Sequence, residues 1–339
     1  MRAEQVKTKR AGFVVIVVLC TVIMLEVLLL GFNYRCRVNL RAAESLQKSQ
    51  QALHCARAGL NIAIAAIKDT NDIYTNRKLL NLFSGKNTFA VGDGNCSVTI
   101  TEENGKLNLN LLKDKSGKLD RTRIDQLLRL IDLINQEDGS YSHIGYGLVP
   151  CIIDWTDSDD QVTYLSFIKH ENLGAESDYY SDLNPAYRCK NQPFEAIDEL
   201  LLIKGITVEI FECIRDYITV YGDGKINLNC ALKRVIESLS EKMDPALAQM
   251  LVDRRKIKPF DSMMELRDVP GMSDSIYYAI KKTATVKPTD RYYHVTSRAK
   301  VGQLDRTVAA ILRTNNDTKN VEVVLYKELQ GAPKKSEKE

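Results

Sequence analysis

A run of twenty mostly apolar residues near the N-terminus limits what this chain can fold into more than any other feature. The run, FVVIVVLCTVIMLEVLLLGF, extends from Phe13 to Phe32. Twenty residues of α-helix are about 30 Å long, which matches the hydrocarbon core of a bilayer. The run is longer than the apolar region of a secretory signal peptide, and no small-x-small cleavage site closes it. We therefore predict one membrane-spanning helix, with the rest of the chain folded outside the bilayer.

The flanks of this run leave two interpretations open. Basic residues precede it, and Arg35, Arg37 and Arg41 follow it, so the distribution of Lys and Arg says little about orientation. Hydropathy alone is typical of an ordinary signal anchor. Residues 38–67, however, keep an apolar pattern of helical period that only Gly59 interrupts. This pattern predicts one long helix that continues beyond the membrane, a shape suited to side-by-side packing in a filament.

The rest of the chain has strand patterns on both sides of a helical middle. Residues 96–101 alternate between apolar and polar side chains, and so do three segments at 293–301, 307–312 and 321–326. Gly302 and the turn formers between the last two segments predict an antiparallel meander. Helical patterns lie near 120–136, 195–203, 206–220, 229–240, 244–256 and 273–284. The sequence thus predicts an α+β fold in which a large, mainly α-helical insertion interrupts a sheet.

Two pairs of similar segments lie within this middle region. Residues 103–110 and 222–229 share the form G-K-[LI]-N-[LI]-N, which predicts a turn followed by an asparagine that caps a helix. Residues 199–207 and 265–273 each predict a helix, a tight glycine turn and a second helix. Such hairpins bind DNA phosphates when basic residues flank them. The neighbouring acidic residues favour a packing role instead.

Two acidic segments form a candidate metal site. Asp154 to Asp160 contains four aspartates, and the segment from Gly174 to Asp182 contains three more acids. Calcium binds six to eight oxygen ligands from flexible loops, and two acidic loops can supply them. The alternative is a solvated acidic loop, because the spacing does not match an EF-hand.

The eight cysteines contain no C-x-x-C pair, which disfavours zinc ribbons and thioredoxin-like motifs. If the domain is exported, disulfides can form. The first pairings we consider are Cys151–Cys189 and Cys213–Cys230, although the sequence leaves the connectivity open.

Taken together, these segments resemble the protein K family of type II secretion, the large minor pseudopilins. The similarity runs along most of the chain, and its order is more specific than any single motif. It includes K-R-A-G-F, ARAGL, ENGKLNLN, I-x-D-W-x-D-x-D, GAESDYY, YRCKNQPF, ELLLIKGIT, YGDGKINLN, RRKIKPF and VPGM.

The resemblance implies a pilin-like sheet with a helical insertion and a set of domain boundaries. We expect a cytoplasmic leader at 1–12, a membrane span at 13–32, the pilin-like domain at 33–110 and 286–328, the insertion at 111–285 and a disordered tail at 329–339. A prepilin peptidase would cut between Gly12 and Phe13. The fifth residue after that cut is Val17, where most pilins have glutamate, and its absence agrees with the family.

The resemblance also implies a function, a metal and partners. The function is a place at the tip of the pseudopilus, where the protein starts assembly and aids export across the outer membrane. The partners it implies are the I-type and J-type minor pseudopilins and the major pseudopilin, with the secretin and exported substrates as further candidates. The metal is calcium, and its candidate ligands are Asp157, Asp159, Asp160, Glu176, Asp178 and Asp182.

Other functions have less support in the sequence. The four histidines lie in no catalytic motif, and G-x-S-x-G, H-E-x-x-H and G-x-G-x-x-G are missing, so we do not expect an enzyme. Lys and Arg number 47 against 44 Asp and Glu, a balance too even to predict a nucleic-acid partner. The alternative is a membrane-anchored, competence-type DNA-binding protein that uses the two helical hairpins. In either case we expect an inner-membrane protein with most of its chain in the periplasm.

The leader makes the first testable prediction. Mass spectrometry of the mature protein should find a chain that begins at a methylated Phe13, because the K-R-A-G-F junction fits prepilin processing. A chain that keeps Met1 would contradict the pilin interpretation and favour an ordinary anchor.

Overall fold

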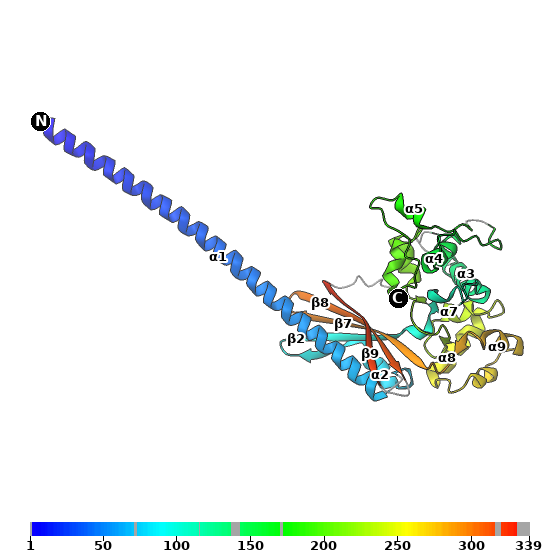
Figure 1. The fold of residues 1–339 in the computed structure, drawn as a ribbon. Helices are drawn as coiled ribbons and strands as arrows, with labels where there is room; N and C mark the ends of the chain where they lie inside the picture. Colours follow the sequence, from blue (N-terminus) through cyan, green and yellow to red (C-terminus); the bar gives the residue numbers. More distant parts are fainter. Residues whose placement is uncertain are drawn as a thin grey trace.

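The computed structural model describes residues 2–70, 73–114, 116–136, 143–169, 172–315 and 320–330. A long helix packs with its C-terminal part on a five-stranded sheet, and a mainly helical part extends from one end of that sheet (Figure 1). This arrangement confirms the predicted α+β fold. Of the expected disordered tail at 329–339, residues 329 and 330 belong instead to the last strand of the sheet, and residues 331–339 lie outside the described residues.

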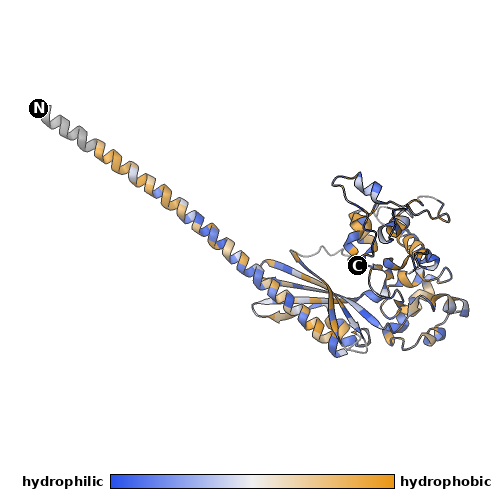
Figure 2. Ribbon diagram, in the orientation of Figure 1, coloured by the Kyte–Doolittle hydropathy of each residue, from blue (hydrophilic) through white to orange (hydrophobic). Residues whose placement is uncertain are grey.

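Helix α1 (Arg2–Thr70) runs without a break through the predicted membrane span. Its apolar stretch, residues 13–32, is the continuous orange segment toward the N-terminal end of the helix in Figure 2. The side chains from Phe13 to Lys48 are all exposed, and the first buried one belongs to Ser49. Within the described chain, this is the one helix that is long and apolar enough to cross a membrane. The exposed apolar surface fits the predicted span.

The C-terminal part of α1 packs closely on the sheet. Ala52, Ala56 and Ala63 are fully buried there and have the spacing of one helix face. Gly59 lies on the same contact: a Cβ added to it would be 2.2 Å from the hydroxyl oxygen of Ser297. The interruption in the helical pattern therefore has a packing role, because it lets the backbone of α1 approach the strands.

The sheet is antiparallel throughout, and the insertion separates two neighbouring strands. Its order is β1-β2-β7-β8-β9. The predicted meander is confirmed as β7, β8 and β9, whereas β1 and the short helices before it were not predicted. The bounds are η1 (Ile73–Thr75), α2 (Arg77–Leu82), β1 (Ser84–Val91), β2 (Gly94–Glu102), β7 (Asp290–Val301), β8 (Leu304–Asn315) and β9 (Val321–Gln330).

The helical part has its own hydrophobic core, which begins at Leu107 and ends at Val286. The core under the sheet forms a separate cluster. Two small parallel sheets, which were not predicted, accompany the helices. The bounds are η2 (Glu103–Gly105), β3 (Leu107–Asn108), η3 (Leu109–Leu111), α3 (Arg121–Asn135), α4 (Leu148–Thr156), α5 (Ser177–Ser181), η4 (Ile197–Leu202), α6 (Val208–Ile214), β4 (Ile218–Thr219), β5 (Ile226–Asn227), α7 (Lys233–Ser238), α8 (Pro245–Ile257), η5 (Met263–Asp268), α9 (Asp274–Ile280) and β6 (Ala284–Thr285).

The repeated G-K-[LI]-N-[LI]-N segments occupy equivalent places. Each supplies a short strand: β3 pairs in parallel with β4, and β5 pairs in parallel with β6. The second asparagine of each repeat joins separate segments. Asn110 donates to the carbonyls of Phe194 and Val220, and Asn229 donates to those of Phe260 and Val286. The first asparagine of the first repeat, Asn108, has the predicted capping role at η3, and Asn227 accepts from the N–H of Asn229 in the same way without a helix following it. The second asparagine connects the chain across each repeat.

The two predicted helix–glycine–helix hairpins are present. In each, a 3₁₀ helix (η4 or η5) leads through a glycine with positive φ to an α-helix (α6 or α9). Gly205 has φ +83° and Gly271 has φ +86°, a conformation that favours glycine. Thr207 and Ser273 then cap the second helices through their hydroxyls. Each hairpin is followed by the strand that pairs with the repeat, so the hairpins are structural parts of these units.

A buried ion pair lies where the sheet meets the helical part. Glu102 is the last residue of β2 and Arg291 is the second residue of β7, and their side chains are 0% and 4% exposed. The guanidinium donates to both Glu102 oxygens at 3.3 and 3.2 Å. Asn227, from the second repeat, donates to the same carboxylate at 2.7 Å. One carboxylate therefore joins two strands of the sheet to the core of the insertion.

Loss of the Glu102–Arg291 ion pair should strongly destabilise the folded protein. Arg291→Met should lower the free energy of unfolding by about 3–5 kcal/mol, because it leaves the buried Glu102 carboxylate without its counter-charge. Chemical denaturation of the full chain in detergent would measure the loss. Arg298→Met is the matched control on the same strand: it breaks the exposed pair with Asp305 and should cost below about 1 kcal/mol. Equal losses would contradict the assigned role of the junction.

Candidate metal centre

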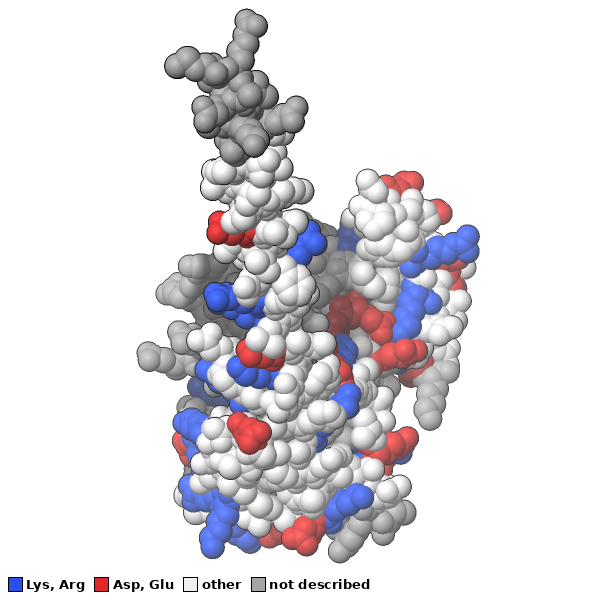
Figure 3. All heavy atoms as spheres, turned by 90° about the vertical axis from the view of Figure 1, so that its left-hand side faces the viewer, with Lys and Arg blue, Asp and Glu red and all other residues white. Residues whose placement is uncertain are grey.

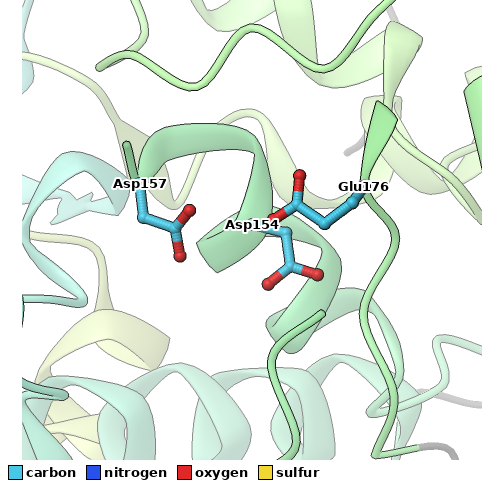
Figure 4. Close-up of side chains that lie close together, drawn as sticks. All are labelled: Asp154, Asp157 and Glu176. Atoms are coloured by element: carbon cyan, nitrogen blue, oxygen red, sulfur yellow. The ribbon is translucent and has the colours of Figure 1, made fainter. Parts of the chain in front are cut away.

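Three carboxylates meet in the helical part. Asp154 lies in the last turn of α4, Asp157 directly follows that helix, and Glu176 directly precedes α5. One oxygen from each lies within 4.8 Å of the others. Figure 4 shows the three side chains directed toward a shared space. Asp154 and Asp157 reach it together because residues three apart lie on the same side of a helix.

The loop between the two acidic segments closes back on α4. Tyr164 and Leu173 form an antiparallel bridge, and the backbone N–H of Thr163 donates to Asp154 Oδ1 at 2.9 Å. Gly174 lies against the same carboxylate: a Cβ at this position would be 1.9 Å from Asp154 Oδ2. Glycine is therefore required for the loop to bring Glu176 beside Asp154.

Most of the oxygens in this cluster have no hydrogen-bond partner in the described part of the chain. Asp154 is 0% exposed and Glu176 is 3% exposed. Asp154 Oδ2, Asp157 Oδ1 and both oxygens of Glu176 are buried and accept no hydrogen bond from any described residue. Burial and the neighbouring acids raise the pKa of Glu176 to about 8, and burial raises the pKa of Asp154 to about 6. Because buried charged groups are normally paired, these oxygens indicate a site for a cation.

The donor set fits a hard cation. Calcium binds carboxylate oxygens, often in bidentate mode, and the three acids offer six. Cys189 is near, but burial raises the pKa of its thiol to about 12, so it stays protonated at neutral pH. Zinc prefers thiolate and imidazole ligands. If a calcium ion binds here, Asp154, Asp157 and Glu176 would hold it.

The predicted ligands divide into two groups. Asp157 and Glu176 belong to the cluster, whereas Asp159, Asp160, Asp178 and Asp182 are exposed and lie outside it. Asp160 Oδ1 accepts from the Ser177 hydroxyl and the Asn191 amide, and Asp159 Oδ1 accepts from the Gln161 N–H. These hydrogen bonds hold the loop after α4, and calcium binding by the four aspartates outside the cluster stays a prediction.

Asp154 was not among the candidate ligands. The sequence feature that could have identified Asp154 is its position three residues before Asp157, near the end of an apolar helix. That spacing can be recognised only once residues 148–156 are assigned as a helix, and this helix was not predicted.

The predicted disulfides Cys151–Cys189 and Cys213–Cys230 are not present in the structure. Cys189 instead donates to the carbonyl of Asp154 at 3.4 Å, and Cys230 donates to the carbonyl of Asn227 at 3.4 Å. Cys151, Cys189 and Cys213 belong to the helical core. Their thiols pack there as small apolar groups.

The proposed processing site lies within α1. Gly12 and Phe13 both have helical backbone, and the Phe13 side chain is exposed. Cleavage at this bond stays a prediction.

The raised pKa values predict how the metal-free protein responds to pH. Between about pH 4.5 and 8 the folded protein keeps a proton on Glu176 that the unfolded chain releases, and between about pH 4 and 6 it likewise keeps one on Asp154, so the free energy of unfolding should fall as pH rises. Thermal melts with a chelator should show this slope, and Glu176→Gln should reduce it. Asp178→Asn, outside the cluster, should keep the slope of the original protein. An unchanged slope in Glu176→Gln would contradict the assignment.

Comparisons with known proteins agree with this architecture. Two family models, both described as type II secretion system protein K, match residues 105–223 and 226–287. Together they cover more than half of the chain, and the boundary between them lies within the second repeated segment, residues 222–229.

Relatives named type II secretion system protein K occur in several bacteria. The Pseudomonas aeruginosa protein is 25% identical over 320 residues, which cover 91% of this chain and 90% of the relative. The Klebsiella pneumoniae protein is 23% identical over 58% of this chain and 57% of its own length.

A solved structure has the same fold. It is a chain of the GspK-GspI-GspJ complex from the type 2 secretion system of enterotoxigenic Escherichia coli, with a TM-score of 0.66 and 17% identity. The match covers 86% of this chain and all of that one. The repeats, the sheet and these matches agree: the chain belongs to the protein K family of the type II secretion system.

Proposed function

We propose that this protein is the minor pseudopilin at the tip of the type II secretion pseudopilus, where it helps to start assembly and aids export of folded proteins across the outer membrane. The position of the helical part carries the proposal. It extends from the end of the sheet that lies away from the N-terminus of α1 (Figure 1). A further subunit added beyond that end would meet the helical part, so this shape suits the last subunit of a filament.

The start of the chain supports the same position. After cleavage between Gly12 and Phe13, the fifth residue is Val17. The pilin glutamate at that place is thought to neutralise the N-terminal amine of the subunit above. A subunit with no neighbour above it has no amine to neutralise.

The membrane and the other pseudopilins would surround different parts of the molecule. The exposed apolar surface from Phe13 to Phe32 would cross the inner membrane, and the bulk of the chain would lie in the periplasm. The I-type and J-type minor pseudopilins and the major pseudopilin would pack beside the spine. The helical part at the tip would contact the secretin and exported substrates.

We further propose that Asp154, Asp157 and Glu176 bind calcium. The ion would supply the positive charge that these buried oxygens lack, and it would fasten the loop after α4 to α5. Its contribution is structural: it would hold together a surface at the exposed end of the molecule.

The DNA-binding alternative is disfavoured by the charges on its hairpins. Arg215 pairs with Glu212 at 2.8 Å, and Arg267 pairs with Asp274 at 3.1 Å. The face of the molecule in Figure 3 has acidic and basic residues mixed together. A nucleic-acid site needs unpaired basic residues gathered on one face.

Co-purification tests the position at the tip. The full chain, expressed with the I-type and J-type minor pseudopilins of the same organism, should form a complex that contains one copy of each. The major pseudopilin alone should not capture it in repeated copies.

Two results would contradict the proposal. One is the failure of the chain to bind either minor pseudopilin. The other is its incorporation at regular intervals along a filament, because the helical part should prevent internal positions.

A further inference from the structure

Lys113 places a protein cation in the candidate metal centre. Its ammonium forms an ion pair with Asp157 Oδ2, and the two side chains are 20% and 6% exposed. Among the described residues, it is the cation ion-paired to the three acids of the cluster. Beside this pair, Asp154 and Glu176 have buried oxygens that accept no hydrogen bond from the residues that the structure describes. The centre therefore contains three carboxylates and one ammonium.

The position of Lys113 depends on a separate part of the chain. It lies after η3, at the end of the first repeat, and forms an antiparallel bridge with Leu119. Asp114 fixes the turn between them, because its Oδ1 accepts from the N–H groups of Ser116 and Lys118. The backbone of Lys113 is thus held independently of the loop that carries Glu176, while its long side chain remains able to swing toward solvent.

An ammonium and a divalent cation compete at such a place. The ammonium occupies one oxygen of Asp157, and its charge repels a metal ion a few ångströms away, the more strongly because the surroundings are buried. A lysine ammonium is also strongly hydrated, so it is released to water at low cost. Metal binding and the Lys113–Asp157 pair therefore oppose each other.

We propose that Lys113 is an internal counter-cation that occupies Asp157 in the metal-free protein, is displaced when calcium binds, and thereby sets the calcium affinity. The inference rests on the calcium site proposed above. Because linkage is reciprocal, an ammonium that weakens calcium binding must itself be loosened by calcium. The effect of Lys113 on calcium binding and the effect of calcium on Lys113 can therefore be measured independently.

The first measurement is calcium affinity, by calorimetry of the full chain in detergent. Lys113→Met should bind calcium about tenfold or more tightly than the original protein, because the competing charge is gone. Lys113→Arg should stay close to the original affinity, because it keeps the charge. Lys106→Met is the matched control: Lys106 pairs with Glu103 at 2.6 Å with side chains 15% and 5% exposed, and its loss should leave the affinity unchanged.

The second measurement needs no variant. Lysine acetylation of the original protein, followed by peptide mass spectrometry, should modify Lys113 several-fold faster with calcium than with a chelator. Lys106 should react at the same rate in both conditions. This test decides the question even if Lys113→Met fails to fold.

The outcomes separate the two proposals. If the original protein binds calcium but Lys113→Met binds it equally or more weakly, or if calcium leaves the Lys113 labelling rate unchanged, Lys113 is not a competing cation. If neither the original protein nor Lys113→Met binds calcium, the metal centre itself is refuted.

Discussion

The buried contact of Glu102 with Arg291 and Asn227 is the constraint on which the rest of the structure depends. The helical part begins after β2 and ends before β7, and these strands are neighbours in the sheet. Both connections therefore leave the sheet at one place, where the Glu102 carboxylate accepts from each side. Asn104 adds a second link, because it donates to the carbonyl of Asp290 and accepts from the N–H of Tyr292. The insertion is held at its two ends by the strands that it separates.

The metal centre has the opposite character. Glu102 has its counter-charge, whereas Glu176 is equally buried and its oxygens have no hydrogen-bond partner among the described residues. A fold tolerates such a group by protonating it or by binding a cation, and the raised pKa of Glu176 reflects the first solution. The Lys113–Asp157 pair corresponds in part to the second solution, because the lysine ammonium is a cation bound to one of the three acids. The stability of the metal centre therefore depends on pH and on the cations in solution, whereas the Glu102–Arg291 junction has its counter-charge within the protein.

The sequence predicted the elements whose signals are local. Strands β7 to β9 have clear alternation, and the two repeats have matching turns and asparagines. Strand β1 was missed because most of its residues are exposed at the sheet edge, which removes the alternation. Helix α4 was missed because nearly all of its residues are buried, so it has no polar face to reveal a helical period. That omission also hid Asp154, and the partnership of Lys113 with Asp157 depends on a contact between distant segments.

The unbroken course of α1 has a mechanical consequence. From Phe13 to Thr70 it has 58 residues, which at about 1.5 Å each make a rod close to 90 Å long. Only about the last third of this helix packs on the sheet, and no proline interrupts the rest of it. A rod of this kind hardly shortens under an axial load, so thrust applied at its membrane end would reach the far end with little lost to bending at a hinge. The folded part of the molecule is thus fixed to the end of a stiff helix and would move together with it.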